Sequence, residues 1–110
     1  MGKPVVGDVV VLPFPQTDLQ AGKRRPAFVV ADLTGDDLIL CQITSQARAD
    51  GYSVPLSPAD FESDDHLDRD SFIRTNRLFT IEQSIILYGI GKVRAPKAIE
   101  VRSRVRELFA

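Results

Sequence analysis

Residues 27–43, with the sequence AFVVADLTGDDLILCQI, predict a β-hairpin and through it the fold class. Two apolar runs, residues 27–31 and 38–43, flank the turn-like sequence Thr34-Gly35-Asp36-Asp37. Gly and Asp adopt tight-turn conformations easily, and apolar runs of this length are typical of strands. We therefore expect two antiparallel strands joined by a tight turn.

Other strand-like runs lie on both sides of this hairpin. The first is rich in valine and ends at Pro13 and Pro15, because proline cannot donate to a β-ladder. The last contains two glycines, which predict a bulge or a sharp bend. A short helical turn is expected at residues 80–84. The expected strands comprise residues 5–12, 52–56 (weakened by Pro55), 71–73 and 85–93.

Only the C-terminal segment has convincing helical periodicity. Between Pro96 and Phe109, apolar residues recur at helical spacing, and proline suits the first turn of a helix. The apolar positions are Ala98, Val101, Val105 and Leu108. Several short strands followed by one helix predict a mainly β fold with a C-terminal α-helix, a small and strongly bent barrel or sandwich. We expect residues 1–110 to form a single domain.

The composition is that of an ordinary globular protein. Hydrophobic residues make up 44% of the 110 residues and charged residues 26%. The lone Cys41 lies in an apolar run and is expected to be a small buried side chain, since no second cysteine is present for a disulfide. No apolar stretch reaches the roughly 18 residues of a membrane span, and no signal-peptide pattern begins the chain. We expect a cytoplasmic protein that does not contact membranes.

Charge is distributed unevenly along the chain. Residues 57–70 carry a net charge of −5, whereas the whole chain carries −1, so the remainder is +4. This acidic segment is expected to be a solvated loop or, alternatively, a gate over a phosphate-binding surface. It contains His66, the only histidine, which we expect to be a solvated loop residue. The spacing of Asp64, Asp65, His66 and Asp68 matches no EF-hand or zinc pattern, so no metal site is expected.

Three polar patches border the apolar runs. They are Lys23-Arg24-Arg25-Pro26, Ile43-Thr44-Ser45-Gln46 and Ser71-Phe72-Ile73-Arg74-Thr75-Asn76-Arg77. Arginine offers a planar fork of donors to phosphate, and a hydroxyl both donates and accepts, so together they suit a phosphodiester. Alternation along an extended strand would place Arg74 and Asn76 on one face. Each patch also has an ordinary structural interpretation: a basic loop, a turn with local hydrogen bonds, and a surface salt bridge, respectively.

The ordered set of patches resembles the MazF/PemK (Kid) toxins of type II toxin–antitoxin systems. The similar features are Gly7-Asp8 before the first strand, the Arg25-Pro26 step, Ile43-Thr44-Ser45-Gln46, and residues 71–76 followed by Thr80-Ile81. The similarity extends over nearly the whole chain. It implies an SH3-like or CcdB-like barrel, a homodimer, metal-independent cleavage of single-stranded RNA without a cofactor, and neutralisation by a small antitoxin protein.

The resemblance also implies roles for individual residues. Arg25, Thr44 and Arg74 match catalytic positions of the family, and Arg74 matches the arginine proposed as general acid. Asn76 stands where the PemK branch has an aspartate proposed as general base, and an amide cannot take a proton from a 2′-hydroxyl. The residues expected to contact RNA beside these are Lys23, Arg24, Ser45, Gln46 and Arg77.

Two alternatives to a ribonuclease remain open. The chain could bind nucleic acid without cutting it, which the departure at Asn76 favours, or it could be an interaction module whose groove holds an antitoxin segment. The apolar stripe of the C-terminal helix, rimmed by arginines, is suited to a two-fold contact. Alternatively, this stripe seals the open end of the barrel.

Overall fold

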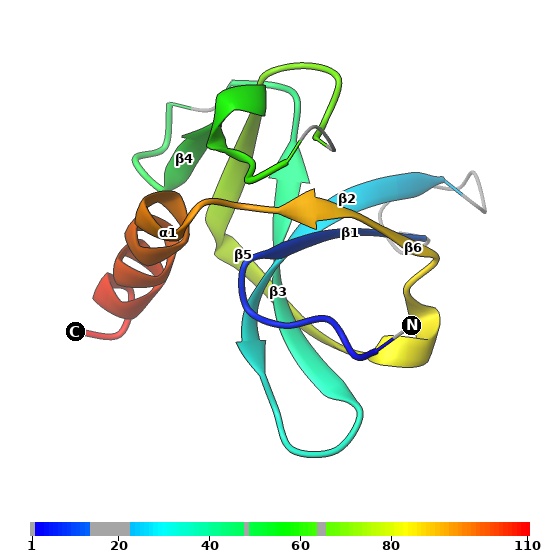
Figure 1. Cartoon of the computed structure of the whole chain (residues 1–110). Coiled ribbons are helices and arrows are strands. Elements are labelled where there is room, and N and C mark those ends of the chain that lie inside the picture. Colours follow the sequence, from blue (N-terminus) through cyan, green and yellow to red (C-terminus); the bar gives the residue numbers. More distant parts are fainter. Residues whose placement is uncertain (1, 14–22, 48, 64–65) are drawn as a thin grey trace.

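Six strands and one α-helix make up the fold in the computed structural model, which describes residues 2–13, 23–47, 49–63 and 66–110 (Figure 1). Short 3₁₀ helices, labelled η, lie between some of the strands. In chain order, the elements are β1 (Asp8–Pro13), β2 (Arg24–Asp32), β3 (Asp37–Thr44), β4 (Ser53–Leu56), η1 (Pro58–Asp60), β5 (Ser71–Glu82), η2 (Gln83–Ile85), β6 (Tyr88–Lys92) and α1 (Ala95–Glu107).

The strands form one antiparallel sheet in the order β4-β5-β3-β2-β1-β6, which curls into a half-barrel (Figure 1). This confirms the prediction of a mainly β fold with a C-terminal helix. The central hairpin is β2–β3, as residues 27–43 predict. Gly35 in its turn has a φ of 81°, a left-handed conformation that glycine adopts without steric cost.

Alternation along the strands divides the buried side chains between two faces. One apolar cluster, which we call the helix-side core, includes Val9, Phe28 and Ile43 and packs against α1 through Val101. The other, the inner core, lies on the opposite side of the same strands. It consists of Val10, Leu12, Ala27, Val29, Leu38 and Leu40. The strands that carry the polar patches of β2 and β3 are therefore packed by apolar side chains on both faces.

Two predictions about buried and bent positions are confirmed. Cys41 is fully buried in the helix-side core, and burial raises the pKa of its thiol to about 12. The ladder between β1 and β6 shifts register between Val9 and Val10, where Val9 pairs with Gly91 and Val10 with Gly89. This is the bulge that the glycines of the last strand predict.

Several element boundaries differ from those predicted. β1 begins only at Asp8, because its side chain accepts a hydrogen bond from the N–H of Val5 (2.9 Å) and holds the preceding residues in a turn. β5 extends through Glu82, far beyond residues 71–73, because it pairs with β3 along most of its length. The helical turn consequently starts at Gln83. β6 is shorter than residues 85–93, since it begins at Tyr88.

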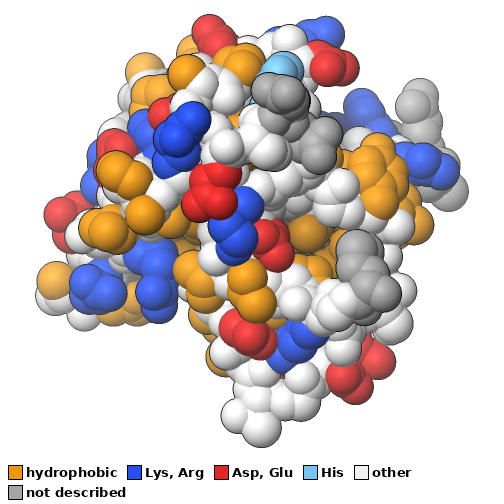
Figure 2. Space-filling model, viewed as in Figure 1, with side chains coloured by type: hydrophobic (Ala, Val, Ile, Leu, Met, Phe, Trp, Pro, Cys, Tyr) orange, Lys and Arg blue, Asp and Glu red, His pale blue; other side chains and the backbone are white. Residues whose placement is uncertain are grey.

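The C-terminal helix uses its apolar stripe within the chain. Ala98, Val101 and Val105 pack against the helix-side core, and Pro96 lies in the first turn as predicted. These three residues of the stripe therefore face the sheet, whereas the prediction of a two-fold contact needs them on an exposed surface. Basic and apolar side chains intermingle on the outside of α1, at the left of Figure 2. Within the described ranges, no helix combines the length and the apolar character needed to cross a membrane.

Candidate functional site

The strand register brings Arg25, Thr44 and Arg74, which belong to three neighbouring strands, onto one face of the sheet. Arg25 of β2 pairs with Leu12, a member of the inner core. In the next strands, Gln42 of β3 pairs both with Ala27 of β2 and with Arg74 of β5. Directly paired residues share a face of an antiparallel sheet. Arg25 and Arg74 therefore flank β3 on the face of the inner core, at the end remote from the β2–β3 turn.

Thr44 continues this face between the two arginines. It lies two residues beyond Gln42 at the end of β3, so its side chain is on the same side. Its Oγ1 accepts a hydrogen bond from the N–H of Gln46 (3.1 Å), which leaves its own O–H group available to donate. The β2–β3 ladder starts at Ala27, one residue after Pro26, because proline lacks the N–H that would extend it.

Arg74 is a buried cation with one ion-pair partner among the described residues. Only 9% of the residue is exposed, and its Nη2 lies 3.6 Å from Oδ2 of Asp50 in the β3–β4 connection. The Nε atom is buried and has no hydrogen-bond partner among the described residues. The N–H of Tyr52 donates to the Asp50 carboxylate, and this bond together with the Arg74 guanidinium holds the pKa of Asp50 below its usual value.

Arg25 has a different environment from Arg74. It is half-buried in β2, and its side chain forms no hydrogen bond or ion pair with any residue that the structure describes. Its neighbours Lys23 and Arg24 are exposed, so this end of β2 carries three cations in a row. The connection that precedes them, residues 14–22, lies outside the described residues.

The third patch departs from simple alternation. Cys41 pairs with Leu78 but the adjacent Gln42 pairs with Arg74, so three residues of β5 bulge out of the ladder with β3. Within this bulge, Asn76 is exposed whereas Arg74 is buried. The bulge thus interrupts the simple alternation on which the prediction of a common face for these two side chains depends, and the two residues differ in burial. Ser45, Gln46 and Arg77, which are expected to contact RNA, are exposed, as are Lys23 and Arg24.

Sequence reasoning missed two polar residues of the site. Gln42 faces both Ala27 and Arg74, and the signal for it was a polar residue within an otherwise apolar strand. Asp50 and Gly51 form a dipeptide that is typical of turns. Nothing in that pattern indicates that Asp50 contacts Arg74, which lies 24 positions later in the sequence. Such a contact arises only because β4 pairs with β5.

The acidic segment contacts the other face of the sheet. Phe61 and Leu67 pack against the helix-side core, and Phe61 also forms a β-bridge with Val93. His66 is exposed, and its Nδ1 lies 2.7 Å from the carbonyl oxygen of Leu67. Asp64 and Asp65 are outside the described residues. Elsewhere in the described ranges, no group of three or more His, Cys, Asp or Glu residues is placed to hold a metal.

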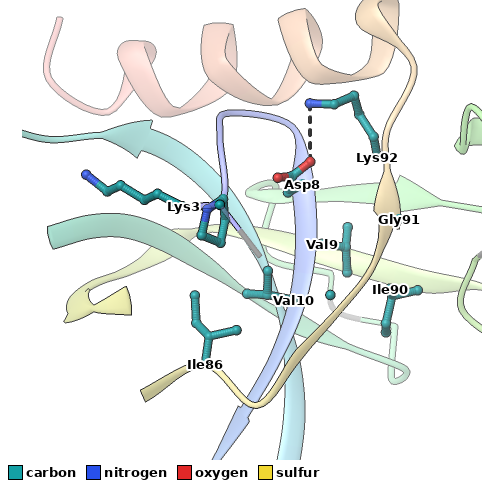
Figure 3. Close-up of a pocket in the computed structure, with 11 residues that line it drawn as sticks. Lys3, Asp8, Val9, Val10, Ile86, Ile90, Gly91 and Lys92 are labelled. Carbon is teal, nitrogen blue, oxygen red and sulfur yellow. Dashed lines mark ion pairs between the residues drawn. The ribbon is translucent and has the colours of Figure 1, made fainter. Parts of the chain in front are cut away.

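A separate pocket of about 430 Å³ lies at the start of β1 (Figure 3). Two of its charged residues neutralise each other, because Nζ of Lys92 lies 3.2 Å from Oδ1 of Asp8. Arg25 pairs with Leu12, four residues further along β1, or about 13 Å away at strand spacing. The pocket is thus distinct from the site of the two arginines.

The chain belongs to the family described as PemK-like, MazF-like toxins of type II toxin–antitoxin systems, whose family model matches residues 6–109. This confirms the resemblance found in the sequence. The search of curated proteins gave no match.

Solved structures of MazF proteins share the fold of this chain. A MazE–MazF structure from Deinococcus radiodurans has a TM-score of 0.77 at 21% identity and covers 100% of this chain and 98% of its own. The MazF-mt6 toxin of Mycobacterium tuberculosis has a TM-score of 0.70 at 16% identity, with 93% and 95% covered. A mycobacterial endoribonuclease in complex with its cognate antitoxin has a TM-score of 0.74 at 14% identity, with 96% and 94% covered.

Proposed function

We propose that this protein is a toxin-type endoribonuclease that cleaves single-stranded RNA, the messenger RNA of the cytoplasm, without a metal or other cofactor. The observation that carries the proposal is the shared face of Arg25, Thr44 and Arg74 on three adjacent strands, in a chain of the PemK-like, MazF-like family. Single-stranded RNA is the substrate because its unstacked bases are accessible, whereas the deep groove of an A-form duplex is not.

The reaction begins with the RNA itself. Its 2′-hydroxyl attacks the adjacent phosphorus and loses a proton, the bond to the 5′-oxygen breaks, and that oxygen gains a proton. The products are a 2′,3′-cyclic phosphate and a 5′-hydroxyl. Because the substrate carries its own nucleophile, the protein has two tasks: to align the backbone and to stabilise charge on the phosphate oxygens.

Each residue of the site has a role in these tasks. Arg25 and Arg74, on either side of β3, donate to the nonbridging oxygens as charge develops on them. Thr44, between them, donates to a nonbridging oxygen or to the 2′-hydroxyl. Asn76 is exposed on the β5 bulge, where its amide is suited to a base edge rather than to proton transfer.

The flanking residues extend the surface for RNA. Lys23 and Arg24 continue the basic end of β2, and Ser45, Gln46 and Arg77 are exposed beside Thr44 and Asn76. Basic side chains of this kind bind successive phosphates and make affinity dependent on salt.

We also propose a homodimer whose activity a small antitoxin protein blocks. The support is the family and the solved MazE–MazF and endoribonuclease–antitoxin structures that share this fold. Light scattering after size-exclusion chromatography measures the mass of the chain alone and after co-expression with the product of a neighbouring small gene. A monomeric mass would contradict the dimer, and undiminished cleavage by the co-expressed complex would contradict the inhibition.

The proposed activity is tested with a fluorescent, mixed-sequence single-stranded RNA in the presence of a chelator. We expect fragments with 5′-hydroxyl ends, which polynucleotide kinase labels without prior phosphatase treatment. The same sequence with 2′-deoxyribose throughout should remain intact, because it lacks the nucleophile. Intact RNA, or cleavage of the deoxy substrate, would contradict the mechanism.

The second candidate function is binding of nucleic acid without cleavage. The observation that favours it is Asn76, which cannot act as the base expected at its position. Fluorescence anisotropy on the same RNA distinguishes the two functions: a binder raises the anisotropy and leaves the RNA intact.

A further inference from the structure

The β3–β4 connection places a carboxylate beside the buried arginine of the site. Oδ2 of Asp50 lies 3.6 Å from Nη2 of Arg74, while the side chain of Asp50 is 29% exposed. This separation exceeds the 2.7–3.2 Å range of a normal N–H···O hydrogen bond, so the two groups attract each other without a tight bond. The pair is thus partly open to solvent on the side of Asp50.

One edge of the Arg74 guanidinium is left incompletely bonded. In arginine, the Nε–H and one Nη2–H are parallel and together bind the two oxygens of an anion. Here Nε is buried without a hydrogen-bond partner among the described residues, and Nη2 faces only the distant Asp50 oxygen. Leaving a buried charged donor unpaired is costly, and such groups are rare unless a ligand completes them.

Asp50 is itself held in place by its neighbours. Its Oδ1 accepts hydrogen bonds from the N–H of Tyr52 (3.0 Å) and, at 3.5 Å, from Oγ of Ser53. The carbonyl oxygen of Tyr52 in turn accepts the hydroxyl (2.6 Å) and the N–H (3.3 Å) of Thr75, the residue after Arg74. The connection is therefore fixed to β5 beside the guanidinium.

A contact from the helix supports the same connection. The guanidinium of Arg104 in α1 donates to the carbonyl oxygen of Gly51, next to Asp50. The connection that carries Asp50 is thus bonded to both β5 and α1, while one oxygen of the carboxylate remains directed at Arg74.

We propose that Asp50 is a positioning residue that holds Arg74 with its Nε–Nη2 edge available for a phosphate of the RNA. This deepens the proposed ribonuclease function and rests on it. In free protein, Asp50 compensates the buried charge of Arg74. When RNA binds, a phosphate takes the incompletely bonded edge, and Asp50 keeps the guanidinium in the orientation that meets the developing charge. Asp50 acts through Arg74 and does not take the proton of the 2′-hydroxyl.

The test compares Asp50→Asn, Arg74→Ala and the double variant with the unaltered protein. Asn keeps an acceptor for the N–H of Tyr52 but removes the charge that faces Arg74. Two quantities are measured: the cleavage rate at saturating RNA, and the Kd of a non-cleavable 2′-deoxy oligonucleotide at fixed salt. Asp36→Asn is the matched control, because Asp36 bonds Gln83 (2.9 Å) at the β2–β3 turn, at the other end of the strands.

The proposal predicts opposite changes in the two quantities. Asp50→Asn should lower the cleavage rate on the order of 10²-fold, through misplacement of Arg74. It should also tighten the oligonucleotide Kd by about two- to fivefold, the range of a partly exposed charge pair, because the Arg74 guanidinium is released from its attraction to Asp50 and binds the phosphate alone. A variant that merely loses stability would weaken binding instead. Asp36→Asn should change neither quantity.

The double variant decides how Asp50 acts. In the Arg74→Ala background, Asp50→Asn should alter neither the residual rate nor the Kd, because its effect passes through the missing guanidinium. A further loss of rate in that background would overturn the proposal and assign Asp50 a direct role such as proton transfer. An unchanged rate in the single variant would also overturn it. If the unaltered protein does not cleave RNA, the ribonuclease function fails, while the Kd cycle still tests the Asp50–Arg74 coupling.

Discussion

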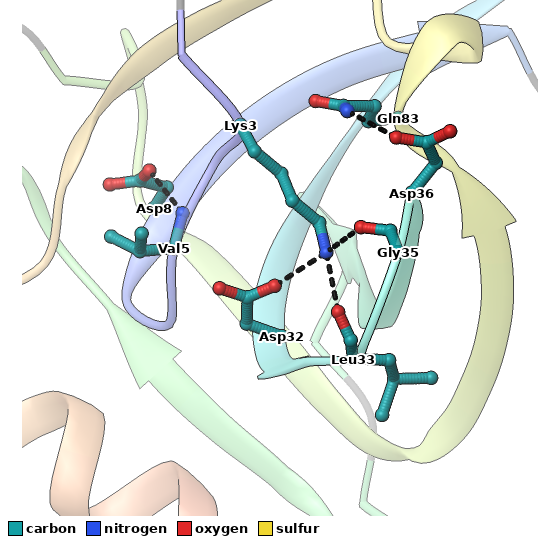
Figure 4. Close-up of polar contacts among 8 residues, drawn as sticks. All are labelled: Lys3, Val5, Asp8, Asp32, Leu33, Gly35, Asp36 and Gln83. Carbon is teal, nitrogen blue, oxygen red and sulfur yellow. Dashed lines mark hydrogen bonds and ion pairs between the residues drawn. The ribbon is translucent and has the colours of Figure 1, made fainter.

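The two ends of the β2–β3 hairpin satisfy their charged groups in different ways. At the turn, Nζ of Lys3 lies 2.7 Å from Oδ1 of Asp32 and donates to the carbonyl oxygens of Leu33 (2.5 Å) and Gly35 (2.7 Å) (Figure 4). At the opposite end, Arg25 has no such partner in the described part of the chain. Charges that are fully bonded within the protein stabilise the fold, whereas incompletely bonded ones remain available to a ligand.

Each end can therefore be altered with a different expected consequence. Substitutions at the turn end should change stability and spare RNA cleavage. Substitutions at the arginine end should do the reverse. A substitution that changes both properties together would show that the two ends are not functionally separate.

The largest effect is expected for Arg25→Ala. Removing a donor aimed at developing charge should lower the cleavage rate on the order of 10²–10³-fold. The melting temperature should change little, because the Arg25 side chain has no hydrogen bond or ion pair to lose within the described residues. Single-turnover cleavage and thermal unfolding measure the two quantities. Arg102→Ala on the exposed side of α1 is the matched control, and it should cleave at the rate of the unaltered protein.

The next effect is expected at the turn end, for Lys3→Ala. Loss of its ion pair and two carbonyl contacts should lower the free energy of unfolding by about 1–2 kcal/mol, measured by urea denaturation. Lys97→Ala is a control of similar exposure whose only ion pair among the described residues is with Glu100, and it should cost less. A cleavage rate reduced as far as in Arg25→Ala would refute the separation of the two ends.

The hairpin at the centre of this comparison was predictable from local sequence. Two apolar runs and the Gly35 turn indicate β2 and β3 directly, and the positions of Arg25 and Thr44 near strand ends follow from them. That Arg25 and Thr44 lie on the same face depends on the order of strands in the sheet. The family resemblance implies this order, whereas no local sequence pattern predicts it. Local patterns therefore predict elements, and the partners of each element require tertiary contacts.

The failures of sequence reasoning lie where tertiary pairing overrides local signals. The β5 bulge exists because the adjacent residues Cys41 and Gln42 of β3 pair with Leu78 and Arg74 of β5, which leaves residues 75–77 out of the ladder. Nothing in the sequence of residues 74–78 predicts this bulge. Asp50 meets Arg74 only through the pairing of β4 with β5. The stripe of α1 suggested a surface for another chain because the extent to which the sheet covers it was unknown.

Thr44 tests a smaller part of the arginine end, because its hydroxyl is neutral. Thr44→Val keeps the shape but removes the O–H donor and the acceptor for the N–H of Gln46. A neutral hydrogen bond contributes about 1 kcal/mol, so the cleavage rate should fall roughly tenfold or less. Thr44→Ser keeps the hydroxyl and should restore most of the rate. Equal rates for the Val and Ser variants would remove Thr44 from the site.

The smallest effect is expected for Asn76→Asp, which introduces the acidic residue found at this position in the PemK branch. Asn76 is exposed on a bulge, whereas Arg74 is buried against the sheet, so the new carboxylate would not share the environment of Arg74. A negative charge near the bound phosphates should raise the KM for RNA about two- to fivefold and leave kcat unchanged. Steady-state cleavage at constant ionic strength separates the two parameters, with Asn76→Ala as the control for loss of the amide. An increase in kcat specific to the Asp variant would mean that a base at this position limits the reaction, and that the bulge lies close enough to the reacting 2′-hydroxyl to supply one.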